Sequence, residues 1–318
     1  MQAKCPVCSN KDSLKESQKC GDFSIFHCNN CGLEFAWPLL AGSKEWYRQA
    51  YFLRRLAPLE KVTDNFIIAL KNLAPKSKIL DIGCGEGIFV NYAVKNGHQA
   101  WGLDFSEEMI EIAKARCPGA VFLTGTLENF LRKYPGEKFD AIAMFEIIEH
   151  LSDPLKLVTD ARAILLPGGK LVISVPNRDC WPVRHFMDNP PQHLTRWNKQ
   201  SLLYLSKKAG FAVDEIRTTR FLSSAHFFLT YLFTQLPFYT LFRQQKQFLG
   251  KLETKKEEKQ LQGIPVAFFK KAGPFLRKLR NAMFWPLVLI LSPILLPIIR
   301  GNTYVLTAHA NQIAPGKS

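Results

Sequence analysis

The stretch LDIGCGEG at residues 80–87 decides the fold. An apolar run reaches Asp81 and is followed by Gly83, Gly85 and Gly87, each two residues from the next. Glycines allow a tight turn after a strand and bring the backbone close to a ligand, and the N–H groups at the start of the next helix point toward what is bound there. The stretch therefore predicts a strand, a turn and a helix start around a nucleoside-type ligand.

A second acid follows at the end of another apolar run. WGLD at residues 101–104 ends in Asp104, where nucleotide-binding folds place the carboxylate that holds the ribose hydroxyls. The GxGxG spacing departs from the dinucleotide pattern GxGxxG, and no phosphate-binding lysine follows it. The ligand is therefore expected to need no phosphate.

The middle of the chain alternates between short β-rich runs and helical patterns. Such alternation predicts an α/β fold with a parallel sheet, whose ligand lies beyond the carboxyl ends of the strands. The predicted strands are 78–82, 99–103, 120–124, 139–144 and 170–175, and the predicted helices are 88–96, 107–116, 127–133 and 154–166.

With FDAIAMFEIIEHLSDP at 139–154 and LLPGGKLVISVPN at 165–177, the chain resembles the class I S-adenosylmethionine-dependent methyltransferases over roughly residues 75–220. The resemblance implies a Rossmann-like seven-stranded sheet, S-adenosylmethionine as the cofactor and methyl transfer as the activity. It also implies that GFAVDEIRTTRF at 210–221 and GNTYVLTAHA at 301–310 are the sixth and seventh strands, paired antiparallel.

The resemblance assigns six cofactor-binding residues. The acid after the first strand would orient the methionine amino group, two glycines would make room for the methionine moiety, and the acid after the second strand would hold the ribose. The next aromatic residue would lie against adenine, and the backbone after the third strand would meet the adenine edge, although Thr126 stands where the family usually has an acid. The six residues are Asp81, Gly83, Gly85, Asp104, Phe105 and Leu127.

Four cysteines near the N-terminus have the spacing of a zinc ribbon. Cys5 and Cys8 form CPVC, Cys28 and Cys31 form CNNC, and the intervening residues can fold as a short hairpin. Four thiolates close a tetrahedral shell and leave no position for water, so a structural rather than catalytic zinc is expected. The start MQAKCPVCSN lacks the apolar core of a signal peptide, which favours a cytoplasmic protein and metal binding over disulfides.

The loop FEIIEH carries the candidate acceptor chemistry. Glu146, Glu149 and His150 fall just after the fourth strand, and the ExxEH pattern is similar to that of quinone-pathway O-methyltransferases, where it is associated with a divalent metal. A hydrogen-bonded structural pair explains the pattern equally well. If the acceptor is a hydroxyl, a histidine suits the removal of its proton, and His150 and His193 are the candidates, with Glu149 beside them. An acceptor that is already ionised would need neither.

The region 222–300 differs from the rest in composition and is predicted to be an insertion between the sixth and seventh strands. It holds a net charge of +9 out of +15, together with apolar runs such as FWPLVLILSPILLPII at 284–299. Prolines interrupt this run and it is short for a spanning helix, so a monotopic anchor on anionic lipid is expected. The alternatives are a packed helical subdomain, a dimer interface or a true membrane span.

These features together predict four segments and one function. Residues 1–40 form a zinc ribbon, 41–74 a helical cap or linker, 75–221 with 301–312 the methyltransferase domain, and 222–300 the anchor. The expected acceptor is a lipid-linked or amphipathic small molecule, handled on the inner face of the membrane. The alternatives are a zinc-ribbon methyltransferase of ribosomal RNA bases and a catalytically silent membrane adaptor. Nucleic acid is not expected, because the positive charge accompanies prolines and aliphatic residues rather than stacking aromatics.

Overall fold

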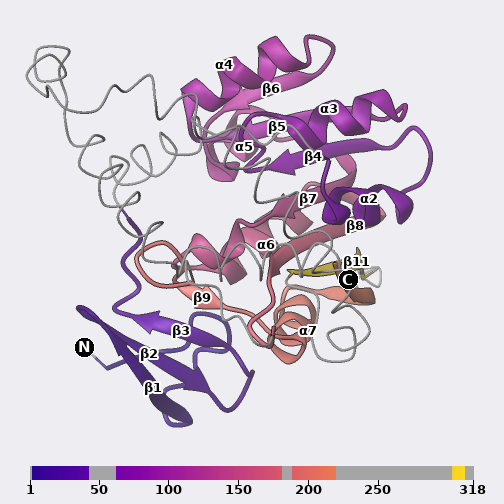
Figure 1. Cartoon of the computed structure of the whole chain (residues 1–318). Coiled ribbons are helices and arrows are strands. Elements are labelled where there is room, and N and C mark those ends of the chain that lie inside the picture. The colour runs from indigo at the N-terminus through magenta and orange to yellow at the C-terminus, as the bar shows by residue number, and fades with distance from the viewer. Residues whose placement is uncertain (1, 43–61, 181–187, 220–302, 312–318) are drawn as a thin grey trace, which may run out of the picture. The chain divides into compact units, whose positions relative to one another are not determined.

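The computed structural model describes residues 2–42, 62–180, 188–219 and 303–311 (Figure 1). All of these except Cys180 belong to one compact unit. The anchor predicted at 222–300, and residues 43–61 of the predicted cap or linker, lie outside the described residues.

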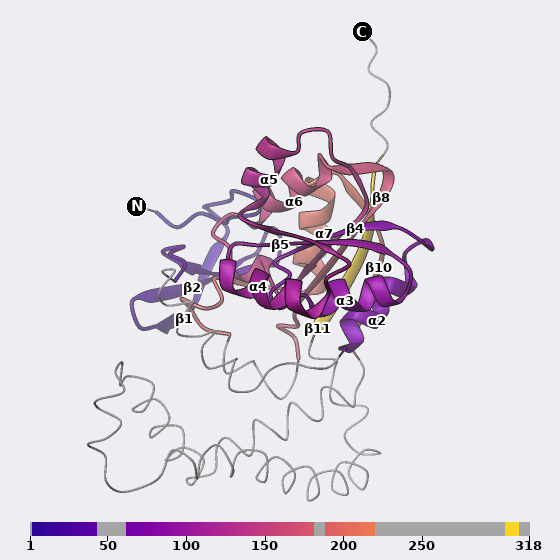
Figure 2. The same ribbon diagram turned by 90° about the horizontal axis from the view of Figure 1, so that it is seen from above.

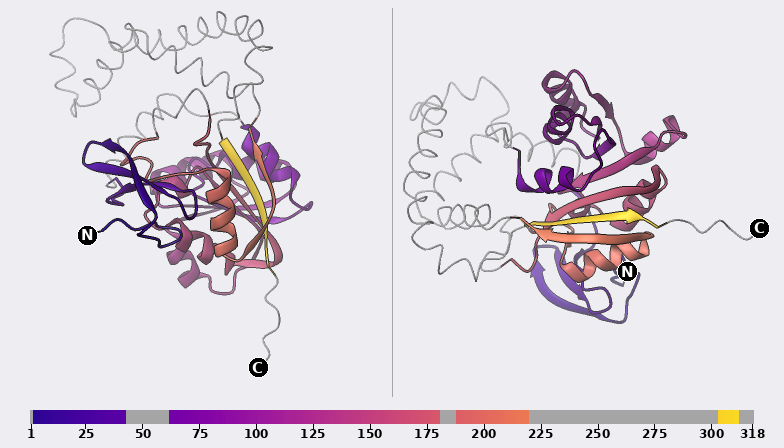
Figure 3. Two further views of the ribbon diagram at one scale, coloured as in Figure 1. Left: turned by 90° about the horizontal axis from the view of Figure 1, so that it is seen from below. Right: turned by 90° about the vertical axis from the view of Figure 1, so that its right-hand side faces the viewer.

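The centre of this unit is a seven-stranded sheet with the strand order β10-β11-β8-β7-β4-β5-β6. Neighbouring strands among β4 to β8 run parallel, whereas β11 runs antiparallel to both β8 and β10, as Figure 3 shows for the hairpin. This confirms the predicted sheet and the predicted pairing of its last two strands. The strands are β4 (Lys78–Ile82), β5 (Gln99–Asp104), β6 (Val121–Thr124), β7 (Phe139–Phe145), β8 (Leu165–Pro176), β10 (Phe211–Thr218) and β11 (Thr303–Ala310).

Helices cover both faces of the sheet (Figure 2). Phe89 and Ile110 belong to the core on one face, and Phe130, Val158 and Leu202 belong to the core on the other. A parallel sheet buried on both faces reads as short continuous apolar runs, which is why its strands could be recognised from sequence. The first face carries α2 (Asp64–Lys71), α3 (Ile88–Lys95) and α4 (Glu107–Arg116), and the second carries α5 (Leu127–Lys133), α6 (Pro154–Arg162) and α7 (Lys199–Lys208).

One helix boundary differs from the sequence prediction. The helix expected at 154–166 ends at Arg162, because the chain turns there into β8, which starts at Leu165. Helical propensity sets the last residues of a helix only weakly. Here the pairing of β8 with β7 ends the helix early.

The N-terminal region forms a second, four-stranded antiparallel sheet (Figure 1). The hairpin of β1 and β2 lies between the two cysteine pairs, as predicted. The fourth strand, β9, comes from the segment between β8 and α7, and Ala36 also donates its N–H to the Leu194 carbonyl at 2.8 Å. The strands are β1 (Leu14–Cys20), β2 (Phe23–Cys28), β3 (Glu34–Trp37) and β9 (Thr195–Arg196).

The small N-terminal sheet shares a core with the larger one. Leu33 and Phe35 are fully buried and belong to the same apolar cluster as Trp197 and Leu202. A ribbon of this size cannot bury enough apolar surface by itself, so burial against the larger unit supplies what it lacks.

Candidate active site

Two buried carboxylates lie at the ends of neighbouring parallel strands. Asp81 in β4 and Asp104 at the end of β5 are both buried. Burial raises the pKa of Asp81 well above its ordinary value, and the charge of Asp104 raises it further. Burial also raises the pKa of Asp104, although the N–H groups of Gly85 and Ser106, each at 2.9 Å, oppose this. Two acids in this setting favour a cationic ligand, because positive charge stabilises their ionised forms.

The three glycines in the turn after β4 differ in what surrounds them. All three have positive φ, at 77° for Gly83, 50° for Gly85 and 70° for Gly87. A Cβ on Gly83 would lie 2.1 Å from Cδ1 of Ile147, and one on Gly87 would lie 2.9 Å from Cβ of Ala113. A Cβ on Gly85 would meet nothing within 4 Å. Gly85 therefore borders open space, while Gly83 makes room for the loop that follows β7.

The residues around the turn fit a nucleoside that carries positive charge. Asp81 Oδ1 is buried and has no hydrogen-bond partner within the described part of the chain. Both oxygens of Asp104 accept backbone N–H groups and keep lone pairs that ribose hydroxyls can use. Phe105, next to Asp104, is 46% exposed and offers an apolar ring. S-adenosylmethionine, with its sulfonium and ammonium groups, matches this set of acids, space and ring.

The start of α5 shows what Thr126 does in the fold. Thr126 caps the helix: its hydroxyl accepts the N–H of Asn129, and the Asn129 side chain accepts the N–H of Thr126 at 3.1 Å. The polar groups of Thr126 are thus committed to the helix end. Leu127 begins the helix with a buried side chain, and its contact with adenine stays a prediction.

His150 lies in η1 (Ile148–His150), just after β7, in the loop that packs on Gly83. Its Nδ1 is 2.6 Å from the carbonyl oxygen of Gln192. A carbonyl only accepts, so Nδ1 carries the proton and the lone pair of the neutral ring is on Nε2. Nε2 lies 4.0 Å from Oε1 of Glu149, whose side chain is 1% exposed.

His193 comes from a distant part of the chain to the same place. Its Nδ1 is 2.8 Å from Oδ1 of Asp188, so this ring too carries its proton on Nδ1. The rings of His193 and His150 are 4.7 Å apart between centroids and meet at 73°. One ligand atom each of Glu149, His150 and His193 lies within 4.8 Å of the others. The structure thus gathers the three residues that the sequence offered for catalysis.

Glu146 does not join this group, which corrects the predicted trio of Glu146, Glu149 and His150. Its backbone has φ of 56°, its N–H donates to the Ser174 carbonyl, and its Oε1 accepts the Ser174 hydroxyl, both at 3.0 Å. The left-handed turn at Glu146, together with a short 3₁₀ segment in place of a full helical turn, separates it from Glu149. His193 completes the group instead.

Sequence reasoning missed Asp188. The signal available was an acid five residues before His193 in the stretch DNPPQH. A surface aspartate is the ordinary reading of that pattern, and only the fold shows that this one is buried against the ring.

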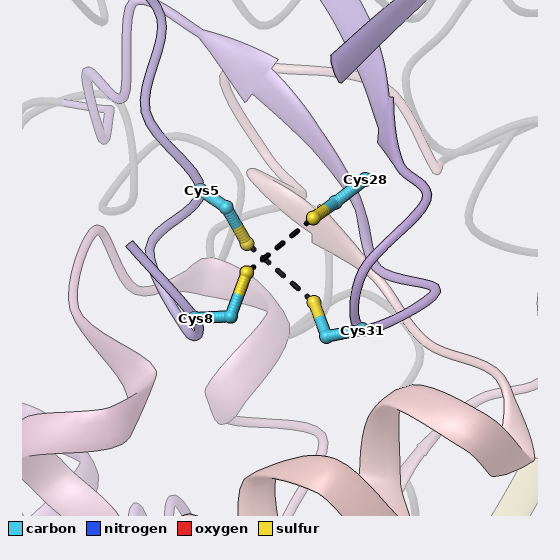
Figure 4. A group of neighbouring side chains, drawn as sticks. All are labelled: Cys5, Cys8, Cys28 and Cys31. Carbon is cyan, nitrogen blue, oxygen red and sulfur yellow. Dashed lines mark hydrogen bonds between the residues drawn. The ribbon is translucent and has the colours of Figure 1, made fainter. Parts of the chain in front are cut away.

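The four predicted cysteine ligands converge at the end of the ribbon (Figure 4). The Sγ atoms of Cys5 and Cys31 are 3.6 Å apart, and those of Cys8 and Cys28 are 3.4 Å apart. A tetrahedral zinc with Zn–S bonds of about 2.3 Å has sulfur atoms about 3.8 Å from one another. The hydrogen bond between Cys31 and Cys5 lowers the pKa of Cys5 and raises that of Cys31, and burial raises the pKa of Cys28. The cluster is therefore compatible with zinc.

Comparisons with known proteins agree with this geometry. A family model described as a methyltransferase domain matches residues 50–216, just over half of the chain. A stretch of 143 residues is 33% identical to a ubiquinone biosynthesis O-methyltransferase of Histophilus somni (strain 2336), covering 43% of this chain and 60% of that protein. A stretch of 137 residues is 30% identical to a probable S-adenosylmethionine-dependent methyltransferase of Mycolicibacterium smegmatis, covering 43% of this chain and 52% of that protein.

The chain thus spans only 60% and 52% of the length of these two relatives. Among solved structures, the [4+2]-cyclase SpnF superposes with a TM-score of 0.52 at 17% identity, covering 85% of this chain and 97% of that one. At that identity the likeness shows the fold alone.

Proposed function

The chain belongs to the methyltransferase domain family and is an S-adenosylmethionine-dependent methyltransferase, and from that premise we propose that it methylates a hydroxyl oxygen of a lipid-linked or amphipathic small molecule at a membrane surface. One observation carries the oxygen acceptor: two histidines whose Nδ1 atoms are held by hydrogen bonds meet beside the loop that packs on the glycine turn. The relative named as an O-methyltransferase supports the same acceptor atom.

On the cofactor side, Asp81 and Asp104 would hold the charged and hydroxyl-bearing parts of S-adenosylmethionine, with Gly85 facing it and Phe105 against adenine. When bound, the cofactor supplies a methyl group on a sulfonium, ready for in-line displacement. The protein then contributes mainly by orientation, because holding the acceptor oxygen behind the methyl carbon removes most of the entropic barrier.

On the acceptor side, a histidine would take the hydroxyl proton as the new carbon–oxygen bond forms. Nε2 of His193 or of His150 bears the lone pair for this step, because the Nδ1 atom of each ring is protonated. Glu149 lies beside His150 and stabilises positive charge that arises there.

A divalent metal at Glu149, His150 and His193 is the second candidate for this group. Two imidazoles and one carboxylate within 4.8 Å of one another are a donor set that suits such an ion. The two roles exclude each other, because a ring nitrogen that binds a metal has no lone pair for a proton. Activity that survives chelation by EDTA would support the base; activity that is lost and then restored by added Mg²⁺ or Mn²⁺ would support the metal.

The membrane context rests on the sequence of residues 222–300, which lie outside the described residues. Their net charge of +9 and their apolar, proline-interrupted runs favour an interfacial position on anionic lipid. In the part of the chain that the structure describes, no helix has the length and apolar character needed to cross a bilayer.

The test uses the purified protein, methyl-labelled S-adenosylmethionine and a whole-membrane lipid extract. We expect label in a lipid-soluble product whose mass increases by one methyl group, and none with Asp104→Ala. A parallel reaction with ribosomal RNA examines the main rival, whose phosphate contacts would give steep salt dependence. Label in RNA with none in the lipid fraction would refute the proposal.

The ribbon is proposed to hold one structural zinc at Cys5, Cys8, Cys28 and Cys31. Metal analysis of the purified protein should give one zinc per chain. Cys31→Ser removes one of the four ligands and should release the metal. Cys20→Ser changes a cysteine of the same ribbon that lies outside the cluster, so the metal should be retained.

A further inference from the structure

A chain of buried charges runs from the N-terminal ribbon to His193. Asp188, Arg196 and Glu34 are each 7% exposed, and His193 is 6% exposed. Asp188 accepts from His193 at 2.8 Å, and Arg196 Nε donates to the Asp188 carbonyl at 2.7 Å while lying 3.6 Å from its carboxylate. Arg196 Nη1 lies 3.7 Å from Oε2 of Glu34. Charges this deeply buried are retained only if they are paired, so each member depends on the next.

The ribbon also holds this segment through its backbone. Glu34 and Arg196 are direct partners in the pairing of β3 with β9, and Figure 1 shows the ribbon strands beside β9. A second arginine, Arg178 just after β8, donates to the carbonyl of Gly32 at 2.6 Å and lies 4.0 Å from Glu34. Gly32 directly follows Cys31, so the cysteine cluster and the charge chain are joined within a few residues.

We propose that Asp188 and Arg196 are positioning residues for His193 and that Glu34 holds them in place, so that the ribbon is a structural part of the acceptor side of the active site. This rests on the proposed function of His193 as the base. The ribbon then accounts for a property that a zinc-binding appendage alone would not have: it fixes which nitrogen of His193 is protonated.

Arg196 makes the tautomer testable. A guanidinium has only donors, so in an Asp188→Asn variant the amide oxygen should turn toward Arg196 and the NH₂ group toward Nδ1 of His193. Nδ1 would then have to accept, and the proton would move to Nε2, where the base needs its lone pair. The substitution is nearly isosteric, so it changes the proton position more than the packing.

The first experiment is ¹⁵N NMR of the full-length protein labelled at histidine, with His193→Gln used to assign the resonance. We expect the wild-type ring to show a protonated Nδ1 and Asp188→Asn to show a protonated Nε2. We also expect the rate of methyl transfer to the membrane lipid extract to fall about 10²-fold or more, with cofactor binding unchanged. An unchanged tautomer would overturn the proposal.

The second experiment tests the link to the ribbon. Glu34→Gln removes the counter-charge 3.7 Å from Nη1 of Arg196, while the hydrogen bonds of the guanidinium to the Asp188 carbonyl and to Asn189 remain. The positive charge of Arg196 is then balanced by Asp188 alone, in competition with His193, so the fraction of the Nδ1–H tautomer should fall while zinc content is retained. Glu16→Gln, on β1 of the same ribbon and exposed, is the matched control and should change nothing. A tautomer that is unaffected by Glu34→Gln would overturn the role of the ribbon, and it would serve as the deciding result if Asp188→Asn did not fold.

The outcomes separate this inference from the proposed function. If His193→Gln keeps its transfer rate, the base role fails, while the tautomer shift still reports whether Asp188, Arg196 and Glu34 set the ring. If the tautomer shifts and the rate falls together, both hold. In that case the double variant Asp188→Asn with Glu34→Gln should be no slower than Asp188→Asn alone, because the two act along one path.

Discussion

Adding one methyl group to Gly83 or to Gly85 should have different consequences, although the two glycines lie in the same turn. The Cβ of Gly83→Ala would lie 2.1 Å from Cδ1 and 2.7 Å from Cγ1 of Ile147, whereas the Cβ of Gly85→Ala would meet nothing within 4 Å. Both positions have positive φ, so backbone strain destabilises both variants, but only the first also forces the neighbouring loop to move.

The expected magnitudes follow from these contacts. A non-glycine residue in the left-handed region costs about 1–2 kcal/mol. Overpacking of a filled site adds about 1–3 kcal/mol. Gly83→Ala should therefore lower the free energy of unfolding by about 2–5 kcal/mol, and Gly85→Ala by only about 1–2 kcal/mol. If the open space beside Gly85 is where the cofactor lies, Gly85→Ala should also weaken cofactor binding at least about tenfold, which is a loss of about 1.4 kcal/mol of binding free energy.

The assay is urea unfolding of each variant, with cofactor titration by calorimetry. Ile147→Ala provides the internal control, because it removes the two clashing carbons and leaves Cβ of residue 147 at 3.9 Å, an ordinary contact. In that background Gly83→Ala should cost only the strain, so the coupling between the two sites should be about 1–3 kcal/mol. An equal cost of Gly83→Ala in both backgrounds, or an unchanged cofactor affinity of Gly85→Ala, would refute the reasoning.

Burial raises the pKa of Asp81 and of Asp104, and the cationic cofactor favours their ionised forms. The affinity for S-adenosylmethionine should therefore be full above these raised pKa values and fall as the pH drops through them, with protons released on binding. A dissociation constant that is independent of pH would contradict this. By the same shifts, the unliganded protein should lose stability as pH rises from the ordinary aspartate pKa through the raised ones, which acid-range thermal scans can measure. Asp104→Ala removes the acceptor of two backbone N–H groups as well as the ribose contact, so cofactor affinity should fall more than with Asp104→Asn in the same titration. Replacing 222–300 by a short linker should abolish sedimentation with anionic liposomes, and binding that persists would refute the anchor.

The large sheet was predictable from the sequence because its signals are local. A strand buried on both faces is a short apolar run, and a parallel sheet places the ends of its strands at one edge, so the two runs that end in Asp81 and Asp104 already imply that these acids lie near each other. The cysteine cluster was predictable for the same reason: each CxxC pair is a local turn, and only the hairpin between the pairs had to form.

The acceptor side was harder to predict because it is assembled from distant segments. The pairing of Phe35 with Thr195 joins residues far apart in the chain, and β9 has only two residues, too few for a periodic pattern. Glu146 was grouped with His150 by their closeness in sequence and by the ExxEH resemblance, neither of which reveals that the backbone turns left-handed at Glu146. Asp188 is buried through its contacts with His193 and with Arg196 of β9, and its own sequence position gives no signal of this.

The two histidines are not equivalent as bases, and the difference lies in what their Nδ1 atoms face. A proton taken up by His193 creates positive charge 2.8 Å from a carboxylate oxygen of Asp188, whereas at His150 the corresponding partner is the neutral carbonyl of Gln192. In a buried site a full counter-charge stabilises an imidazolium more than a dipole does. Arg196 prevents the carboxylate of Asp188 from being left as an isolated buried charge when His193 is neutral. We therefore propose His193 before His150 as the proton acceptor, because its carboxylate partner at 2.8 Å is closer than Glu149, which lies 4.0 Å from Nε2 of His150.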